Sequence, residues 1–227
     1  MSVQVEIPSE IPVMTLPEVV LFPHAMLPLY IFEPRYRQML QDVLESDRLF
    51  VVAGQDLEKA RVTGEFEPPF GIASVGIIRA SHLNDDETSN LIIQGLARVR
   101  IRRIISEEPY RLVQIEALST EPGAQEETLE ADRARLTDLL KAHRKLGGEV
   151  PEEIMDFLGS LRDNDTFLDL AAFTLCPDER EKQRLLETLS TAERFERFFG
   201  VLQRANENLV IDNKLRGGLP DDRIELN

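Results

Sequence analysis

The chain of 227 residues is 42% hydrophobic and 30% charged, so it can bury one substantial core or two smaller ones. It has no stretch near the roughly 20 consecutive apolar residues of a membrane span and no recognisable secretory signal. Its net charge of −15 opposes binding to nucleic acids and to anionic membranes. The single cysteine, Cys176, cannot form an intramolecular disulfide, which favours a reducing, cytoplasmic location.

Short apolar segments bounded by Pro, Gly, Asn and Asp dominate residues 11–118 and predict a small antiparallel β domain that carries one helix. The expected strands cover residues 49–53, 72–78, 91–93 and 110–115. The polar residues 82–90 are expected to join two antiparallel strands. One helix is expected from about Pro34 to Glu45, with an apolar face that covers the end of a sheet. That face consists of Tyr36, Met39, Leu40 and Val43.

The proline-rich segment at residues 21–37, LFPHAMLPLYIFEPRYR, is the most distinctive part of the sequence. Pro23 and Pro28 keep the backbone extended and remove two N–H donors, so a strand here must be short or lie at a sheet edge. Five bulky apolar side chains crowd into this segment: Phe22, Met26, Leu27, Tyr30 and Phe32. Either all of them serve the core of the β domain, or some remain exposed as a docking surface for extended apolar peptides.

The segment ends in the motif Glu33, Pro34, Arg35 and Tyr36. Pro34 has the backbone geometry of a first helical turn. The Arg35 guanidinium can hold a carboxylate or loop carbonyls, and Tyr36 can offer its ring to the core and its hydroxyl to a polar group. We therefore expect this motif to fix the proline-rich segment to the β domain, and only secondarily to touch a partner.

The apolar period changes from 2 to 3.6 after residues 121–124, which predicts a helical second half. A first helix ends at Gly147 and a second begins at Pro151. Residues 164–166 supply cap candidates for a third helix, and a fourth spans residues 179–188. Ser190 and Glu193 fit a capping box for a last helix. The predicted domains are residues 1–120 (β), residues 121–211 (helical bundle) and a flexible tail at 212–227, which together make an α+β fold.

Three sets of residues resemble the LON domain, the N-terminal substrate-recognition domain of Lon proteases. The first set is residues 11–37, the second is the Gly-x-x-Arg-x-Arg pattern in residues 95–101, and the third is residues 168–172 with 182–187. In order and spacing they cover residues 10 to 205, as in stand-alone LON-domain proteins. The resemblance implies a PUA-like pseudo-barrel followed by helices, and a role in recognising protein substrates.

No pattern in the sequence favours catalysis. It lacks the phosphate-binding loop that nucleotide hydrolysis needs and the Ser/Lys dyad of a full Lon protease. Ser74 lies between glycines within an expected strand, at the wrong spacing for a nucleophile elbow. His24, His82 and His143 are scattered, so no metal site is expected. The carboxylate pairs 85–86 and 152–153 lie at turns or helix starts, where acidic residues favour the helix dipole or solvent.

Arg98, Arg100 and Arg102 are the only concentrated basic feature. In a strand they share one face, while Val99 and Ile101 point the other way. This alternation predicts a solvated strand face over a buried one. The alternative is a small patch that binds an anion or a nucleic acid.

These observations favour a non-enzymatic module, without cofactor or metal, that binds unfolded or extended protein segments or a protein partner. Two alternatives remain open. PUA-like folds elsewhere bind RNA, although the charge of −15 opposes this. An enzyme of unrecognised type would show a deep pocket with strongly perturbed titratable groups. The sequence names neither the partner nor an oligomeric state.

Overall fold

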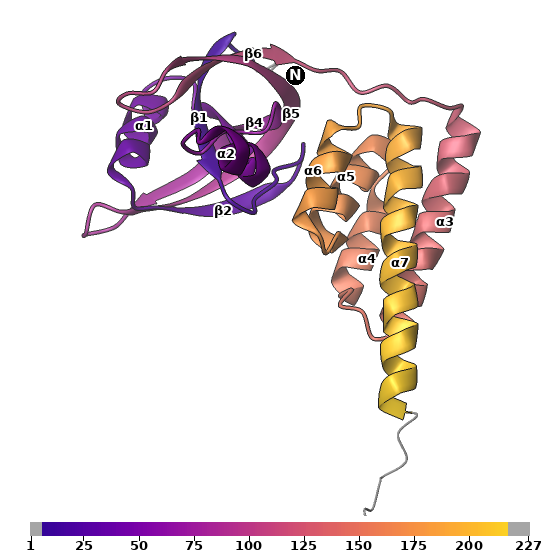
Figure 1. Cartoon of the computed structure of the whole chain (residues 1–227). Helices are drawn as coiled ribbons and strands as arrows, with labels where there is room; N and C mark the ends of the chain where they lie inside the picture. Colours follow the sequence, from indigo (N-terminus) through magenta and orange to yellow (C-terminus); the bar gives the residue numbers. More distant parts are fainter. Residues whose placement is uncertain (1–5, 218–227) are drawn as a thin grey trace, which may run out of the picture. The chain divides into compact units, whose positions relative to one another are not determined.

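The computed structural model describes residues 6–217, and in this part of the chain it has an α+β fold with six strands and seven helices (Figure 1). These residues form two compact units. The sheet unit contains residues 6–121 and 169–189, and the helical unit contains residues 122–168 and 190–217. The boundary at 121 follows the change of sequence period, but residues 169–189, which we expected in the helical bundle, group with the sheet.

The six strands form one sheet in the order β2-β5-β4-β3-β1-β6. Because β6 also pairs with β5, five strands close into a barrel, and β2 remains at the outer edge of β5. All neighbours are antiparallel except β1 and β3, which are parallel, so the expectation of a wholly antiparallel domain is wrong there. β2 and the first helix supply the crossover that a parallel pair requires. The strands are β1 (Glu10–Leu16), β2 (Met26–Ile31), β3 (Leu49–Gly54), β4 (Ile72–Leu83), β5 (Ser89–Ser106) and β6 (Leu112–Ala117).

The barrel is filled by β-branched and aliphatic side chains from five strands, among them Ile11, Val51, Val75, Val99 and Val113. β5 is long enough, at 18 residues, to pair with β2 and β4 in its first half and with β6 in its second. Register shifts along its pairings allow this strand to bend around the barrel.

Gly95 of β5 allows the β1–β2 loop to reach the sheet. A Cβ atom at this position would lie 2.0 Å from the carbonyl oxygen of Phe22, a distance that no side chain can tolerate. The close approach brings His24 N–H to 2.8 Å from the Gly95 carbonyl oxygen. Only glycine therefore fits the first position of the Gly-x-x-Arg pattern.

The sequence predicts the first helix of the sheet unit but not the second. Helix α1 (Pro34–Leu44) buries Tyr36, Met39, Leu40 and Val43, which confirms the predicted apolar face. Helix α2 (Leu57–Thr63) was not predicted, because it buries none of its residues and so has no apolar stripe. Asp56 nevertheless caps α2, since its Oδ1 accepts a hydrogen bond from Lys59 N–H at 2.8 Å.

Arg98 corrects the expectation of a solvated basic strand face. Its side chain is 1% exposed and donates to both carboxylate oxygens of Asp169, at 2.6 and 2.8 Å. Its Nε donates to the Leu186 carbonyl oxygen at 2.9 Å. Residues 169–189 thus cover this part of β5, whereas Arg100 and Arg102 farther along it remain near solvent and pair with Glu116.

In the helical unit, aromatic residues of the last helix stack against the core. Phe195 lies 6.4 Å from Phe167 and 6.3 Å from Phe199 between ring centroids. Ser190 Oγ accepts a hydrogen bond from Glu193 N–H at 3.3 Å, as half of the predicted capping box requires. The remaining helices of the chain are α3 (Glu126–Lys145), α4 (Glu152–Ser160), α5 (Asn164–Leu175), α6 (Glu179–Glu187) and α7 (Thr191–Gly217).

Two expectations for this half change. The cap of α5 is Asp163, whose Oδ2 accepts from Thr166 N–H at 2.7 Å, while Asn164 instead donates to Glu126. Helix α7 continues to Gly217, so the expected tail is wrong for residues 212–217, and residues 218–227 lie outside the described part. None of the described helices is long and apolar enough to cross a membrane.

Candidate protein-interaction surface

The structure separates the five apolar residues of the proline-rich segment into two groups. Phe22 is completely buried, and the Arg98 guanidinium lies 5.9 Å from its ring centroid. Leu27 is half-buried. The other three are exposed: Met26 to 47%, Tyr30 to 53% and Phe32 to 59%. Phe22 therefore belongs to the core, and the remaining question is what the exposed residues do.

Strand alternation explains this division. Successive residues of a strand point to opposite faces, so Met26, Pro28 and Tyr30 share the outer face of β2, and Leu27, Leu29 and Ile31 face inward. Pairing places Ile92 of β5 opposite Pro28, and Ala80 of β4 opposite Ile92. An exposed apolar row therefore crosses three strands. We call these residues the outer face: Met26, Pro28, Tyr30, Phe32, Ala80 and Ile92.

Two aromatic rings give the outer face a defined shape. Tyr30 and Phe32 stack with their centroids 6.0 Å apart and their planes at 27°. Ile92 adds a side chain that is 39% exposed. Polar groups border the apolar residues, including Arg79, whose Nε donates to Gln94 Oε1 at 2.8 Å. Contiguous exposed apolar surface with a polar rim is typical of protein interaction sites.

The outer edge of β2 is the second part of the site. The Gly95 N–H donates to the Ala25 carbonyl oxygen at 2.9 Å, and antiparallel ladders alternate every second residue. The backbone groups of Met26, Pro28 and Tyr30 therefore point away from β5. Pro28 has no N–H, which interrupts the edge and opposes uncontrolled strand pairing. A short extended segment could still pair with the backbone of Met26 and Tyr30.

The Glu33–Tyr36 motif lies beside the outer face and makes mainly internal contacts. Arg35 Nη2 lies 2.9 Å from a Glu33 carboxylate oxygen and 2.7 Å from one of Glu67. Its guanidinium stacks 4.5 Å above the Tyr36 ring and 5.6 Å from the Phe66 ring. Burial alone would lower the pKa of Arg35, but its hydrogen bonds and nearby acidic groups outweigh this and raise it.

Tyr36 connects α1 to the barrel. Its hydroxyl donates to the Thr15 carbonyl oxygen at 3.1 Å and accepts from Thr15 N–H at 3.2 Å. Burial raises the pKa of Tyr36, so the hydroxyl remains a neutral donor. These contacts support a structural role for the motif, which holds the segment between β2 and α1 in place.

The residues that could carry chemistry do not converge. Ser74 Oγ is buried and donates to the Leu21 carbonyl oxygen at 2.6 Å, which ties the β1–β2 loop to β4. His143 Nδ1 pairs with Asn206 Oδ1 at 2.6 Å in the helical unit. Burial raises the pKa of the Cys176 thiol to about 11, so it is not a thiolate at neutral pH. Within residues 6–217, no group of His, Cys, Asp and Glu could hold a metal ion.

Comparison with known proteins places residues 10–204 in one family model, the ATP-dependent protease La (LON) substrate-binding domain. The chain is 27% identical over 221 residues to the Lon protease of Dictyoglomus thermophilum, covering 96% of this chain and 27% of that protein. It is also 27% identical over 210 residues to the Lon protease of Haemophilus influenzae, covering 91% of this chain and 25% of the relative. The chain therefore spans about a quarter of the length of these relatives.

Two solved structures share the fold. The N-terminal domain of Mycobacterium avium complex Lon protease matches with a TM-score of 0.65 at 18% identity, over 87% of this chain and 98% of that one. A Lon N-terminal domain protein from Xanthomonas campestris matches with a TM-score of 0.57 at 18% identity, over 85% and 98%. At this identity the likeness establishes the fold.

Proposed function

Because the chain belongs to the ATP-dependent protease La (LON) substrate-binding domain family, we propose that it is a protein-recognition module that binds extended apolar segments of other proteins. The outer face carries this proposal. It combines two stacked aromatic rings, an exposed Met26 and Ile92, and the free edge of a short strand. Apolar pockets and strand edges together provide the side-chain and backbone contacts of β-augmentation.

In this proposal the module acts without catalysis of its own. The sequence contains no phosphate-binding loop, Ser74 and His143 are engaged in separate hydrogen bonds, and burial raises the pKa of Cys176. We propose a cytoplasmic location, which a lone protonated thiol at Cys176 supports. The nucleic-acid alternative loses its main feature, because Arg98 is buried against Asp169, and Arg100 and Arg102 share Glu116.

Direct binding measurements test the outer face. We expect a labelled extended apolar peptide, alternating valine and serine, to bind the chain in a fluorescence-anisotropy titration. Phe32→Ser should weaken this binding about tenfold, because loss of a well-packed aromatic anchor costs on the order of 1–2 kcal/mol or more. Phe157→Ser is the matched control, since Phe157 is similarly exposed, at 49%, but belongs to the helical unit.

Comparison of the two variants can refute the proposal. Equal affinities for Phe32→Ser, Phe157→Ser and the unchanged chain would show that the outer face does not contact the peptide. Far-UV circular dichroism of both variants establishes that the fold is intact, as expected for exposed positions.

A further inference from the structure

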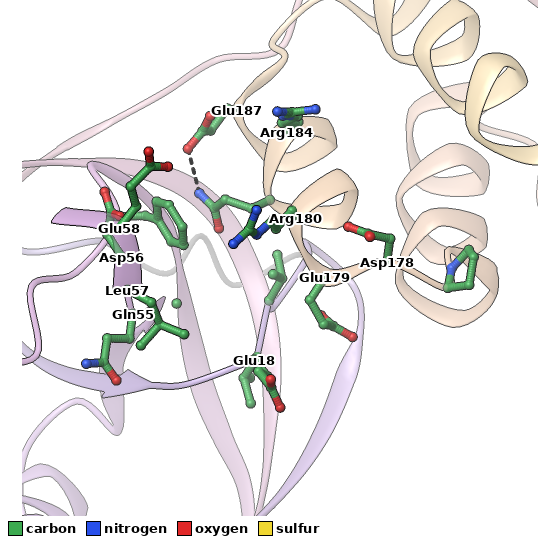
Figure 2. A pocket seen from close by; sticks show the side chains of 16 residues that line it. Glu18, Gln55, Asp56, Leu57, Glu58, Asp178, Glu179, Arg180, Arg184 and Glu187 are labelled. Carbon is green, nitrogen blue, oxygen red and sulfur yellow. Dashed lines mark hydrogen bonds between the residues drawn. The ribbon is translucent and has the colours of Figure 1, made fainter. Parts of the chain in front are cut away.

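The sheet unit contains a groove of about 520 Å³ that is separate from the outer face (Figure 2). One wall comes from the loop after β1, the end of β3 and the start of α2, and the other comes from α6 and the residues before it. Every lining residue belongs to the sheet unit. Gln183 fixes α6 against β4, because its Nε2 donates to the Ile72 carbonyl oxygen at 3.0 Å.

Apolar side chains line part of this groove. Val19, Val20, Leu57 and Phe70 contribute to it, and Leu57 is 53% exposed. Gly54 keeps the space open, since a Cβ there would lie 3.1 Å from both the Phe70 ring and the Val19 carbonyl oxygen. The groove can therefore receive an aliphatic chain as well as a polar group.

The charges around the groove are predominantly negative, with six carboxylates against two guanidinium groups. The two arginines, Arg180 and Arg184, lie on α6, whereas Glu18, Asp56 and Glu58 lie on the opposite wall (Figure 2). Glu18 and Glu58 are exposed and form no ion pair with any described residue. That wall therefore offers free negative charge without internal neutralisation.

A buried acceptor provides an independent observation. Gln183 is 3% exposed, and its Nε2 uses both of its donor positions, on Ile72 and on Glu187 Oε1 at 2.8 Å. Its Oε1 has no hydrogen-bond partner among the described residues. A buried acceptor without a donor costs free energy, so a ligand that brings an N–H group would be stabilised here.

An anionic ligand fits poorly, although two helices begin at the groove. The Asp56 side chain caps α2, and the Asp178 side chain caps α6 by accepting from Glu181 N–H at 2.9 Å. These carboxylates already satisfy donors that an anion would use, and they would repel it.

We propose that this groove binds the lysine or arginine side chain of an extended protein segment. The aliphatic stem lies against Val19, Leu57 and Phe70, and the cationic head lies near Glu18 and Glu58, with an N–H directed to Gln183 Oε1. Long basic side chains bury their stems on apolar surface while the head keeps polar contacts. This site does not depend on the outer face, so each can be tested without the other.

The test uses two labelled peptides that alternate valine with lysine or valine with glutamine. The lysine peptide binds more tightly than the glutamine peptide, and added salt weakens only the lysine peptide. Glu18→Gln combined with Glu58→Gln weakens the lysine peptide on the order of tenfold, as loss of two charge contacts implies. Glu130→Gln combined with Glu207→Gln is the matched control, because both residues are exposed in the helical unit and the net charge changes equally.

A second readout locates the site. In ¹H–¹⁵N NMR spectra, the side-chain amide signals of Gln183 shift when the lysine peptide binds. Equal binding of the two peptides, equal weakening in the control pair, or an unshifted Gln183 amide at saturation would overturn the proposal. So would competition by spermine as strong as that by the lysine peptide, because the groove would then bind free polycations. Phe32→Ser leaves the affinity ratio between the lysine and glutamine peptides unchanged, because the valines of both peptides contact the outer face equally; this distinguishes the groove from the outer face.

Discussion

Asp169→Ala should destabilise the sheet unit more than any surface charge substitution. The change removes both carboxylate contacts of Arg98, at 2.6 and 2.8 Å, and leaves the guanidinium with the Leu186 carbonyl oxygen. The Arg98 side chain is 1% exposed, so water does not replace the lost acceptors. Removing one partner of a buried ion pair costs about 3–5 kcal/mol, because the other charge stays buried and uncompensated.

Urea denaturation followed by far-UV circular dichroism measures this loss. Glu116→Ala is the control, since Glu116 pairs with Arg102 at the surface, where both side chains are about half exposed. We expect that control to cost less than about 1 kcal/mol. The double variant Arg98→Met with Asp169→Leu should recover most of the loss, because it removes both charges and keeps the volume. A loss in Asp169→Ala no larger than that of Glu116→Ala would refute the reasoning.

Two further predictions concern Tyr36 and Cys176. Tyr36→Phe should cost about 1–2 kcal/mol in the same assay by removing the hydroxyl contacts with Thr15, and Tyr36→Ala about 3–5 kcal/mol by also leaving a cavity. Wild-type stability in both would assign the motif to recognition. Burial raises the pKa of Cys176 from 9.0 to about 11, so the folded state holds the thiol proton more tightly. The stability that this tighter proton binding gives the folded state is complete below pH 9 and disappears as the pH rises to about 11. Between pH 9 and about 11, the free energy of unfolding should therefore fall less for Cys176→Ala than for the unchanged chain. Parallel plots of unfolding free energy against pH for the two proteins would contradict the buried, protonated state of Cys176.

Local sequence patterns predict the elements whose burial is decided within one element. The apolar face of α1 is visible in the sequence because Tyr36, Met39, Leu40 and Val43 all face the same neighbour. The period change near residue 121 likewise marks where the chain leaves the sheet unit. Helix α2 could not be predicted in this way, because it is short and has no buried face that would produce an apolar pattern.

Burial that depends on distant segments could not be predicted. The strand alternation predicts that Arg98 is exposed to solvent. It is buried because Asp169, 71 positions later in the sequence, packs against β5 and binds its guanidinium. The same limit applies to the proline-rich segment. Its prolines predict an edge strand, but only the register of β2 on β5 decides that Tyr30 is exposed and that Ile92 joins it.

Both proposed sites belong to the sheet unit, yet one of them needs residues from late in the chain. The outer face uses β2, β4 and β5, all before residue 107. The groove acquires its second wall from α6, which the Arg98 contacts to Asp169 and Leu186 hold against the barrel. Helix α6 also supplies the Gln183 oxygen, which has no partner within residues 6–217. Arg98 and Asp169 do not line the groove, but a substitution at either residue can displace α6 and so change the binding of a basic side chain. The strand pairings that form the outer face do not involve α6. The buried ion pair thus links the position of α6, and with it the second wall of the groove, to the binding of a basic side chain.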